Sequence, residues 1–221
     1  MTASILNDNV DTVNILVYDE IMPQDTYHHG NLKEALITAG QQILSEKGIE
    51  GLSLRKVARK AGVSHTAPYN HFADKQALLA ALSAAGHAQL HQQLSQTFDD
   101  AKSSSSDVLI DIAWSYLQFA LADPGRFHLM FSGALEVERD HPDYVAVSQK
   151  NIALLEEIIS FCQARGELTG GSLTDHAIRI WSYVHGFTNL ILEDQFPAGY
   201  RLDRDLRDLL KVVILCPARK D

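Results

Sequence analysis

The segment from Leu32 to Leu79 constrains the fold of this chain more than any other, because glycines divide it into short amphipathic pieces. The first piece ends at Gly48, which suits the left-handed residue that commonly terminates a helix. Ser53 is a good N-cap for the second piece, and Gly62 ends that piece after about two turns. The apolar residues of these pieces recur at helical spacing: Leu36, Ile43 and Leu44, then Leu54, Val57, Ala58 and Ala61. We therefore expect two helices and a sharp turn at Gly62, where glycine enters the left-handed region freely.

A third short helix is expected directly after Ser64, the next candidate N-cap. Its residues supply hydrogen-bond donors, acceptors and a small apolar surface, the groups that read base edges in the major groove: His65, Thr66, Ala67, Tyr69, Asn70 and His71. Pro68 lacks a backbone N–H, so this helix is expected to begin irregularly. The three helices together predict a helix-turn-helix DNA-binding domain over residues 27–75, with double-stranded DNA as its partner.

The distribution of charge agrees with this prediction although the whole chain is acidic, with a net charge of −9. Residues 27–75 contain seven Lys or Arg and four Asp or Glu, a net of +3, whereas residues 1–26 carry −5 and residues 76–221 carry −7. Basic charge is thus concentrated where phosphate contacts are needed.

A specific motif accompanies the helical pattern. The sequence GIEGLSLRKVARKAGVS, then Tyr69, the pair His71-Phe72 and Lys75, resembles the TetR family of bacterial transcriptional regulators. The resemblance covers residues 27–80 closely and the remainder only by length and helical pattern. Pro68 is a departure, since the family usually has an aliphatic residue there.

The resemblance implies roles for individual residues. Tyr69 and Lys75 correspond to phosphate contacts, with Lys75 in the first turn of a further helix that Asp74 would cap. Ser53 and Arg55 lie at the start of the second helix, where the family commonly touches the DNA backbone or a base. The alternative interpretation of the segment is an ordinary all-α core with a basic surface.

The rest of the chain predicts further helices, so the fold class is all-α, with a larger helical ligand-binding and dimerisation domain over residues 76–221. Turn signals separate these helices, which are expected near residues 74–98, 107–121, 124–131, 144–165, 174–194 and 203–215. A two-fold homodimer is expected because one short recognition helix reads too few bases. The last two helices offer apolar residues for its interface: Phe187, Leu190, Ile191, Leu206, Leu209, Leu210, Val213 and Ile214.

A second resemblance lies in RIWSYVHGFTNL, where Trp181, His185 and Gly186 match the Trp-His-Gly class of TetR-family C-terminal domains. It implies a cavity for an unknown small-molecule effector, which the aromatic content of the body predicts to be hydrophobic or aromatic. The candidate ligand-binding residues are His91, Trp114, Phe119, Phe127, Phe131, Trp181 and His185, and Tyr116 and Met130 are further candidates to line the cavity. The alternative for most of them, Trp181 included, is simple core packing.

The sequence contains no catalytic constellation and no glycine-rich phosphate motif, so we expect a protein that is not an enzyme and uses no cofactor. His87 and His91 stand four residues apart, a spacing that can chelate a metal, but no further ligand accompanies them, so a polar helix face is the preferred interpretation. Two rival classes remain open, namely a small-molecule enzyme that uses these histidines or His185, and a helical protein-interaction module without specific DNA binding.

Location and the N-terminal segment complete the predictions. Two cysteines, Cys162 and Cys216, are too few for a disulfide framework and indicate a reducing cytoplasm, with a redox sensor as the alternative. No apolar run reaches the roughly 20 residues that span a membrane. Residues 1–26 contain no Lys or Arg and are expected to form a flexible arm rather than a secretory signal; an acidic arm that covers the basic face or packs on a partner subunit is the alternative.

Overall fold

The computed structural model describes residues 29–104, 107–131, 133, 141–195 and 205–215. These residues form helices and no strand, which confirms the all-α prediction. The elements are α1 (His29–Lys47), η1 (Ile49–Gly51), α2 (Leu54–Lys60), η2 (Ala67–Asn70), α3 (Lys75–Lys102), α4 (Val108–Ala122), α5 (Pro124–Phe131), α6 (Pro142–Ala164), α7 (Leu173–Leu192) and α8 (Leu206–Leu215).

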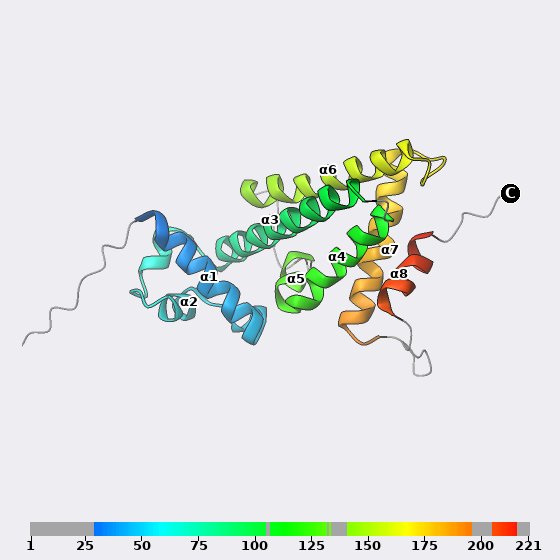
Figure 1. The fold of residues 1–221 in the computed structure, drawn as a ribbon. Helices are drawn as coiled ribbons and strands as arrows, with labels where there is room; N and C mark the ends of the chain where they lie inside the picture. The colour runs from blue at the N-terminus through cyan, green and yellow to red at the C-terminus, as the bar shows by residue number, and fades with distance from the viewer. Residues whose placement is uncertain (1–28, 105–106, 132, 134–140, 196–204, 216–221) are drawn as a thin grey trace, which may run out of the picture.

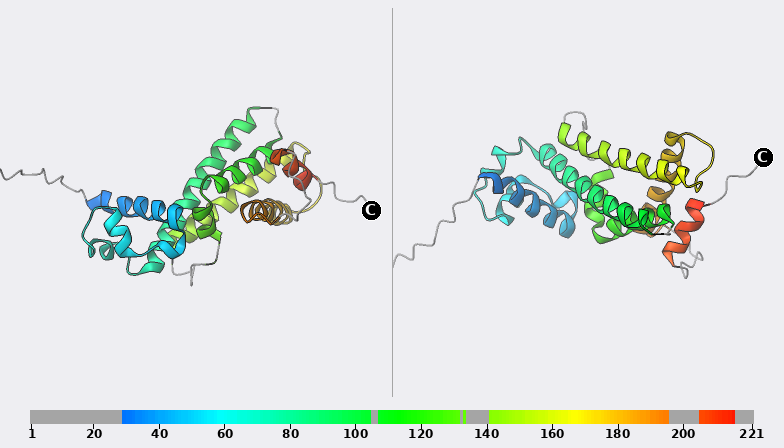
Figure 2. Two further views of the ribbon diagram at one scale, coloured as in Figure 1. Left: turned by 90° about the horizontal axis from the view of Figure 1, so that it is seen from below. Right: turned by 45° about the horizontal axis from the view of Figure 1, so that its top comes forward.

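A small N-terminal unit and a larger helical body are joined by one long helix. The unit contains α1, α2 and η2 and lies at one end of the molecule (Figure 1). From there α3 runs into the body, where α6 lies beside it along much of its length, as Figure 2 also shows. Below this pair α4 packs on α3, α7 packs on α4 and α6, and α8 packs on α4 and α7. The short α5 lies between α1 and α3, so it touches both parts of the molecule.

Helix ends follow the predicted capping signals. Asp74 caps α3, because its side chain accepts a hydrogen bond of 2.9 Å from the backbone N–H of Ala77. Ser172 caps α7 in a reciprocal capping box with Asp175. Several ends differ by a few residues from the predicted ranges: α1 begins at His29, ahead of Leu32, α3 continues to Lys102, and α6 begins at Pro142. The first residues of the helix predicted over 203–215 lie outside the described residues.

The buried side chains of the described residues form two hydrophobic clusters. The body cluster is built from α3, α4, α6, α7 and α8, with Phe127 and Met130 of α5. The N-terminal cluster is built mainly from α1, α2 and the start of α3, yet Leu129 of α5 and Tyr144 of α6 belong to it. Helices of the body therefore contribute side chains directly to the core of the N-terminal unit.

The apolar residues predicted for a dimer interface on the last two helices mostly pack inside the chain. Phe187, Leu210 and Ile214 are buried, and four others of the set pack against the same body cluster, namely Ile191, Leu206, Leu209 and Val213. The amphipathic face of α8 is thus used against α4 and α7. Of the predicted set, only Leu190 is exposed, at 39 %.

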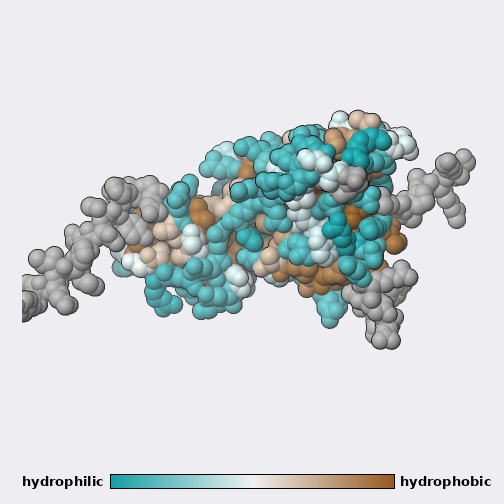
Figure 3. All heavy atoms as spheres, in the orientation of Figure 1, coloured by the Kyte–Doolittle hydropathy of each residue, from teal (hydrophilic) through white to brown (hydrophobic). Residues whose placement is uncertain are grey.

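Other apolar side chains of α7 and α8 point outward instead. Ile178, Tyr183 and Leu190 of α7 and Val212 of α8 are all exposed. In Figure 3, hydrophobic residues gather over the end of the body that holds α7 and α8, whereas hydrophilic residues cover α6. None of the helices in the described ranges combines the length and the apolar character that crossing a membrane requires. The N-terminal arm predicted over residues 1–26 lies outside the described residues.

Candidate functional site

The turn between α2 and the following segment has the predicted geometry. The side chain of Ser53 accepts a hydrogen bond of 3.3 Å from the backbone N–H of Lys56 and so caps α2. Gly62 has a φ of +70°, and the N–H of Val63 reaches back to the carbonyl of Ala58 at 3.0 Å. This bond closes the left-handed helix end that glycine permits. The chain therefore reverses within a few residues, as a helix-turn-helix requires.

The segment after the turn is shorter and tighter than an α-helix. Residues Ala67–Asn70 form a 3-10 helix, η2, with Pro68 in its first turn. The expected cap at Ser64 is wrong: Thr66 precedes the helix, and the Ser64 hydroxyl bonds to the Thr66 hydroxyl at 3.1 Å instead. Because Pro68 has no N–H to donate, a regular first α-turn is lost, which is the irregular start that the sequence predicted.

The residues predicted to contact DNA divide into an exposed and a partly buried group. His65, Thr66, Tyr69 and Asn70 are exposed, Tyr69 at 52 %, and so are Arg55 and Lys75. Ser53, Ala67 and His71 are half-buried. Phe72 is buried beside them and fixes η2 on the N-terminal cluster. The polar side chains of η2 and the loop before it therefore face solvent from one anchored segment.

The basic residues around this segment are not equivalent. Lys60 forms an ion pair of 2.6 Å with Glu46 on α1, and Lys56 donates to the carbonyl of Gly51 at 3.0 Å. These two lysines hold the N-terminal unit together. Within the part of the chain that the structure describes, Arg55 and Lys75 form no ion pair, so their charges stay available to a polyanion.

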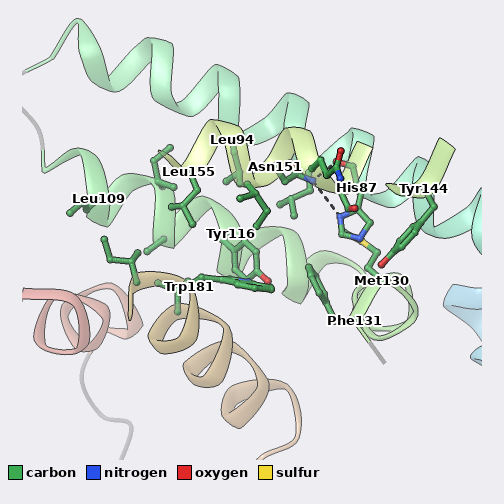
Figure 4. Close-up of a pocket in the computed structure, with 18 of the residues that line it drawn as sticks. His87, Leu94, Leu109, Tyr116, Met130, Phe131, Tyr144, Asn151, Leu155 and Trp181 are labelled. Carbon is green, nitrogen blue, oxygen red and sulfur yellow. Dashed lines mark hydrogen bonds between the residues drawn. The ribbon is translucent and has the colours of Figure 1, made fainter. Parts of the chain in front are cut away.

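A cavity of about 450 Å³ lies in the body, between α3, α4, α6 and α7, and α5 closes one end of it. Figure 4 shows His87 and Tyr144 at one end, Leu109 at the other, and Tyr116 and Trp181 between them. Its described wall is mainly aliphatic and aromatic, with a few polar side chains and no charged residue. A pocket of this size and lining suits a small, largely apolar molecule.

Asn151 of α6 and His87 of α3 form the polar end of the cavity. The side-chain nitrogen of Asn151 lies 3.1 Å from the backbone carbonyl of His87 and 3.3 Å from its Nδ1 (Figure 4). The imidazole of His87 is only 4 % exposed and packs edge-on against the rings of Phe131 and Tyr144. Burial lowers the pKa of His87, and the backbone of Met130 offsets part of this effect. Nε2 of the ring is buried and has no hydrogen-bond partner among the described residues.

The Trp-His-Gly motif of α7 supports the middle of the cavity. Trp181 lines it while remaining 42 % exposed, so its indole forms part of the rim. His185 lies behind the wall, where its Nδ1 is 2.9 Å from the hydroxyl of Tyr116, and burial lowers its pKa. Burial also raises the pKa of the Tyr116 hydroxyl far above its ordinary value, so this pair stays neutral near pH 7. Gly186 lies on the outer face, where an added Cβ would meet no atom within 4 Å.

The structure brings only some of the predicted ligand-binding residues to the cavity. Phe131 and Trp181 line it, and His185 touches it through Tyr116. Phe127 and Phe119 are buried core residues and His91 is half-buried on α3, and these three residues are outside the lining. Trp114 lies in a separate polar groove with Arg207 and Asp111. The aromatic content of the sequence predicted a hydrophobic body, but it did not distinguish the residues that line the cavity from those packed in the hydrophobic core.

Sequence reasoning missed the two residues of α6 that form the polar end of the cavity with His87, namely Asn151 and Tyr144. Asn151 is one polar residue among several on an amphipathic helix, and no spacing rule separates it from the others. Tyr116 and Met130, by contrast, were predicted as further candidates for the cavity wall, and both line it. The hydrogen bond from Asn151 to α3 depends on the packing of α6 against α3, which the sequence did not predict.

Two alternatives become less attractive from the geometry. Among the described residues, no group of three His, Cys, Asp or Glu side chains converges as a metal site. Cys162 is fully buried, and burial is the main cause that raises the pKa of its thiol to about 12. A protonated, buried thiol reacts slowly with oxidants, so Cys162 does not have the character of a redox sensor. Cys216 lies outside the described residues.

A short turn between two helices, an exposed polar segment after it, and a hollow helical body define a helix-turn-helix protein with a ligand cavity. Residues 36–82 match the family described as bacterial regulatory proteins of the tetR family, and residues 109–214 match a tetracyclin repressor-like C-terminal domain. The chain belongs to the TetR family of transcriptional regulators, which bind DNA, respond to ligands and are not enzymes. The second match includes the Trp-His-Gly motif.

Individual relatives agree with this assignment. The HTH-type transcriptional regulator YobS of Bacillus subtilis is 27% identical over 168 residues, which cover 76% of this chain and 82% of YobS. A solved structure of a Rhodococcus sp. RHA1 protein has a TM-score of 0.73 and 30% identity, and the match covers 87% of this chain and 96% of that one. The fold is also that of the transcriptional regulator FadR from Bacillus subtilis, solved in complex with stearoyl-CoA, with a TM-score of 0.63, 17% identity, and 83% and 96% of the two chains covered.

Proposed function

We propose that this protein is a homodimeric repressor of the cytoplasm that binds a palindromic DNA operator and is released by a small hydrophobic or aromatic effector. In this proposal residues 27–75 bind DNA, and residues 76–221 bind the effector and the second subunit. The observation that carries the proposal is that one long helix, α3, begins with the candidate phosphate contact Lys75 and continues into the wall of the cavity at His87.

The N-terminal unit would make two kinds of contact with DNA. Arg55, Tyr69 and Lys75 bind phosphates or the sugar backbone and hold the unit in register, since their side chains are exposed. His65, Thr66 and Asn70 read base edges from the segment around η2, with Ala67 offering a small apolar contact. The half-buried Ser53 and His71 contribute from the edges of this face. A 3-10 segment is short, so each subunit reads few bases and two subunits are needed.

For the dimer, the proposal uses the outward face of α7 together with Val212 of α8. Ile178, Gly186 and Leu190 lie along one side of α7 and are exposed. Gly186 has open space around it, so the backbone of a second helix can approach closely there. Burying this face in a two-fold contact would remove apolar surface from water on both subunits at once.

For the effector, the chemistry of the cavity supports a neutral and mainly apolar molecule. Its described wall carries no charged side chain, and its histidine has a pKa lowered by burial. FadR of Bacillus subtilis, which shares the fold, is solved with stearoyl-CoA, a ligand with a long apolar chain. A cavity between α3, α4, α6 and α7 would accept an apolar group of that general kind.

The coupling between effector and DNA would pass through shared side chains. Tyr144 lines the cavity and belongs to the N-terminal hydrophobic cluster, and Leu129 of α5 joins it there. The backbone of α5 also approaches α1 so closely that a Cβ on Gly125 would lie 2.8 Å from the carbonyl oxygen of Leu44. A ligand that displaces Tyr144 or α5 would therefore change the position of the N-terminal unit, provided that it binds the two arrangements with different affinity.

The test is selection of bound sequences from randomised duplex DNA by the purified full chain at moderate salt. We expect a palindromic site, because paired recognition segments related by two-fold symmetry read inverted half-sites. Tyr69→Ala should weaken binding to the selected site, whereas Tyr183→Ala, an exposed tyrosine on α7, should keep the same site preference. A correctly folded chain that enriches no sequence at low salt would instead support the protein-interaction module.

A further inference from the structure

The polar end of the cavity has a fixed hydrogen-bond pattern. The backbone carbonyl of His87 can only accept, so the atom of Asn151 that lies 3.1 Å from it must be the amide nitrogen. The same nitrogen lies 3.3 Å from Nδ1 of His87, which therefore acts as the acceptor of the second amide proton. Both protons of the Asn151 amide are used by α3, and its orientation is set.

The consequence is that the oxygen Oδ1 of Asn151 is left over. It is buried and has no hydrogen-bond partner among the described residues. Asn151 lines the cavity, so a molecule that packs against this side chain can supply the missing donor. A buried acceptor without a partner costs free energy, and a ligand that supplies a donor removes that cost.

Two neighbouring polar groups are already engaged. Ser148, one turn before Asn151, donates its hydroxyl to the carbonyl of Val145 at 3.0 Å. The hydroxyl of Tyr116 is paired with His185 at 2.9 Å. Two lining atoms at this end have no partner among the described residues, the acceptor Oδ1 of Asn151 and Nε2 of His87, which carries the ring proton when Nδ1 accepts. A hydroxyl group can donate to the first and accept from the second, and the described wall has no cation to balance an anion.

We infer that the ligand of this cavity is an uncharged molecule with an apolar body and one hydroxyl group, which donates a hydrogen bond to Oδ1 of Asn151. This inference rests on the proposed effector-controlled function and narrows the chemical class of its ligand. His87 acts as a positioning residue, since it holds the amide with the oxygen directed away from α3. A carboxylate is disfavoured, because its oxygens would meet the acceptor Oδ1 and the described wall holds no cation to balance its charge.

Binding of three matched probes tests the inference: decanol, decyl methyl ether and decanoate. The Trp114→Phe variant of the full chain leaves Trp181, which lines the cavity, as its only tryptophan, so its emission reports occupancy. We expect decanol to bind about tenfold more tightly than the ether, which lacks the donor, and decanoate to bind more weakly than both. Equal affinity of alcohol and ether, tighter binding of decanoate, or no binding of decanol up to its solubility limit overturns the inference.

A second layer of the test identifies the residue. In Asn151→Leu the alcohol and the ether should bind with affinities within about a factor of three of each other, since both hydrogen-bonding atoms of the amide are gone. Ser148→Ala is the matched control on the same helix and should keep the preference for the alcohol. If the preference disappears in Ser148→Ala and survives in Asn151→Leu, Asn151 is not the anchor and the inference is overturned. The comparison of probes in the parent chain stands even where a variant fails to fold.

The same samples separate this inference from the proposed function. Operator binding is measured with and without saturating decanol. Preferential binding of the alcohol without any change in operator affinity would leave the inference intact and contradict control by this ligand class. Release from the operator by a compound that has no hydroxyl and binds as well to Asn151→Leu would preserve the proposed function and overturn the inference.

Discussion

The rings of His87 and Tyr144 meet edge to face with their centroids 5.4 Å apart. His87 belongs to α3 and forms the polar end of the cavity, while Tyr144 lines the same cavity and packs into the hydrophobic cluster of the N-terminal unit. One ring contact therefore joins the wall of the ligand cavity to the core that supports the DNA-binding face. An aromatic pair of this kind contributes about 1 kcal/mol beyond the area that it buries.

Replacing Tyr144 with leucine should reduce the response to the effector more than it reduces DNA binding. Leucine keeps an apolar side chain in the N-terminal cluster and loses the ring contact with His87, so stability should fall by about 1–3 kcal/mol. Operator affinity without effector should stay within about threefold of the parent, a change of less than 1 kcal/mol. Effector-induced release, measured by fluorescence anisotropy, should weaken. Tyr144→Phe keeps the ring and is the control; a response lost equally in both variants would contradict coupling through the ring contact.

Lys75→Ala should weaken operator binding and reduce its salt dependence. Lys75 is exposed at the first turn of α3, and a lysine that neutralises one phosphate adds about one unit to the slope of log affinity against log salt. A dimer loses two such contacts, so the slope should become shallower by about two. Lys102→Ala at the other end of α3 removes the same charge from the body and serves as the control. An unchanged slope for Lys75→Ala would remove Lys75 from the phosphate contacts.

Gly125→Ala should destabilise the junction between the N-terminal unit and the body. The added Cβ would lie 2.8 Å from the backbone oxygen of Leu44, which cannot move aside as a side chain can. We expect a loss of about 1–3 kcal/mol in the free energy of unfolding, measured by urea denaturation. Gly40→Ala is the matched control, because its Cβ would meet only the far end of the Leu82 side chain at 2.9 Å. Equal stability of the two variants would show that α1 and α5 separate easily.

How far the sequence predicts this structure depends on how local the signal is. Gly48, Gly62 and Asp74 mark helix ends through their own backbone preferences or side-chain caps, and each does so in the structure. The irregular start of η2 also follows locally, from the missing N–H of Pro68. Capping and turn chemistry involve residues within a few positions of one another, which is why a single sequence contains them.

Long-range packing was less predictable. The sequence marks Phe127, Phe131 and Trp181 equally as large aromatic residues, yet Phe127 is core while the other two face the cavity. The predicted dimer residues failed for the same reason, since Leu210 and Ile214 on α8 are buried in contacts within the chain. An amphipathic stripe predicts that one face of a helix packs against another element. Which element it packs against depends on the packing of all the helices together.

Stability should fall as the pH decreases below about 7, because the fold disfavours the protonated form of two histidines. Burial lowers the pKa of His87 and of His185 from the ordinary 6.5 in the folded chain. The unfolded chain then binds more protons in this range, so the stabilisation is complete above the unfolded pKa of 6.5 and is lost as the pH falls toward the folded values. The melting temperature of His87→Gln should depend less on pH than that of the parent. His65→Gln, an exposed control, should follow the parent curve; a flat parent curve would show that neither ring is held neutral.

Charge placed on the outward face of α7 should dissociate the proposed dimer without unfolding the subunit. Ile178 is 59 % exposed in the single chain, so Ile178→Glu costs the isolated subunit little. In a two-fold interface the same substitution occurs twice and buries two carboxylates, so the dissociation constant should rise at least about a hundredfold, which corresponds to about 2.7 kcal/mol. Sedimentation velocity measures the shift to monomer, and circular dichroism checks that the helices remain. Leu121→Glu, at an exposed apolar position on α4, is the matched control and should stay dimeric. If Leu121→Glu dissociates the dimer and Ile178→Glu does not, the interface lies on α4 and the proposed interface is wrong. In either case, operator binding by the two variants should follow their oligomeric state, because a monomer holds only one recognition segment.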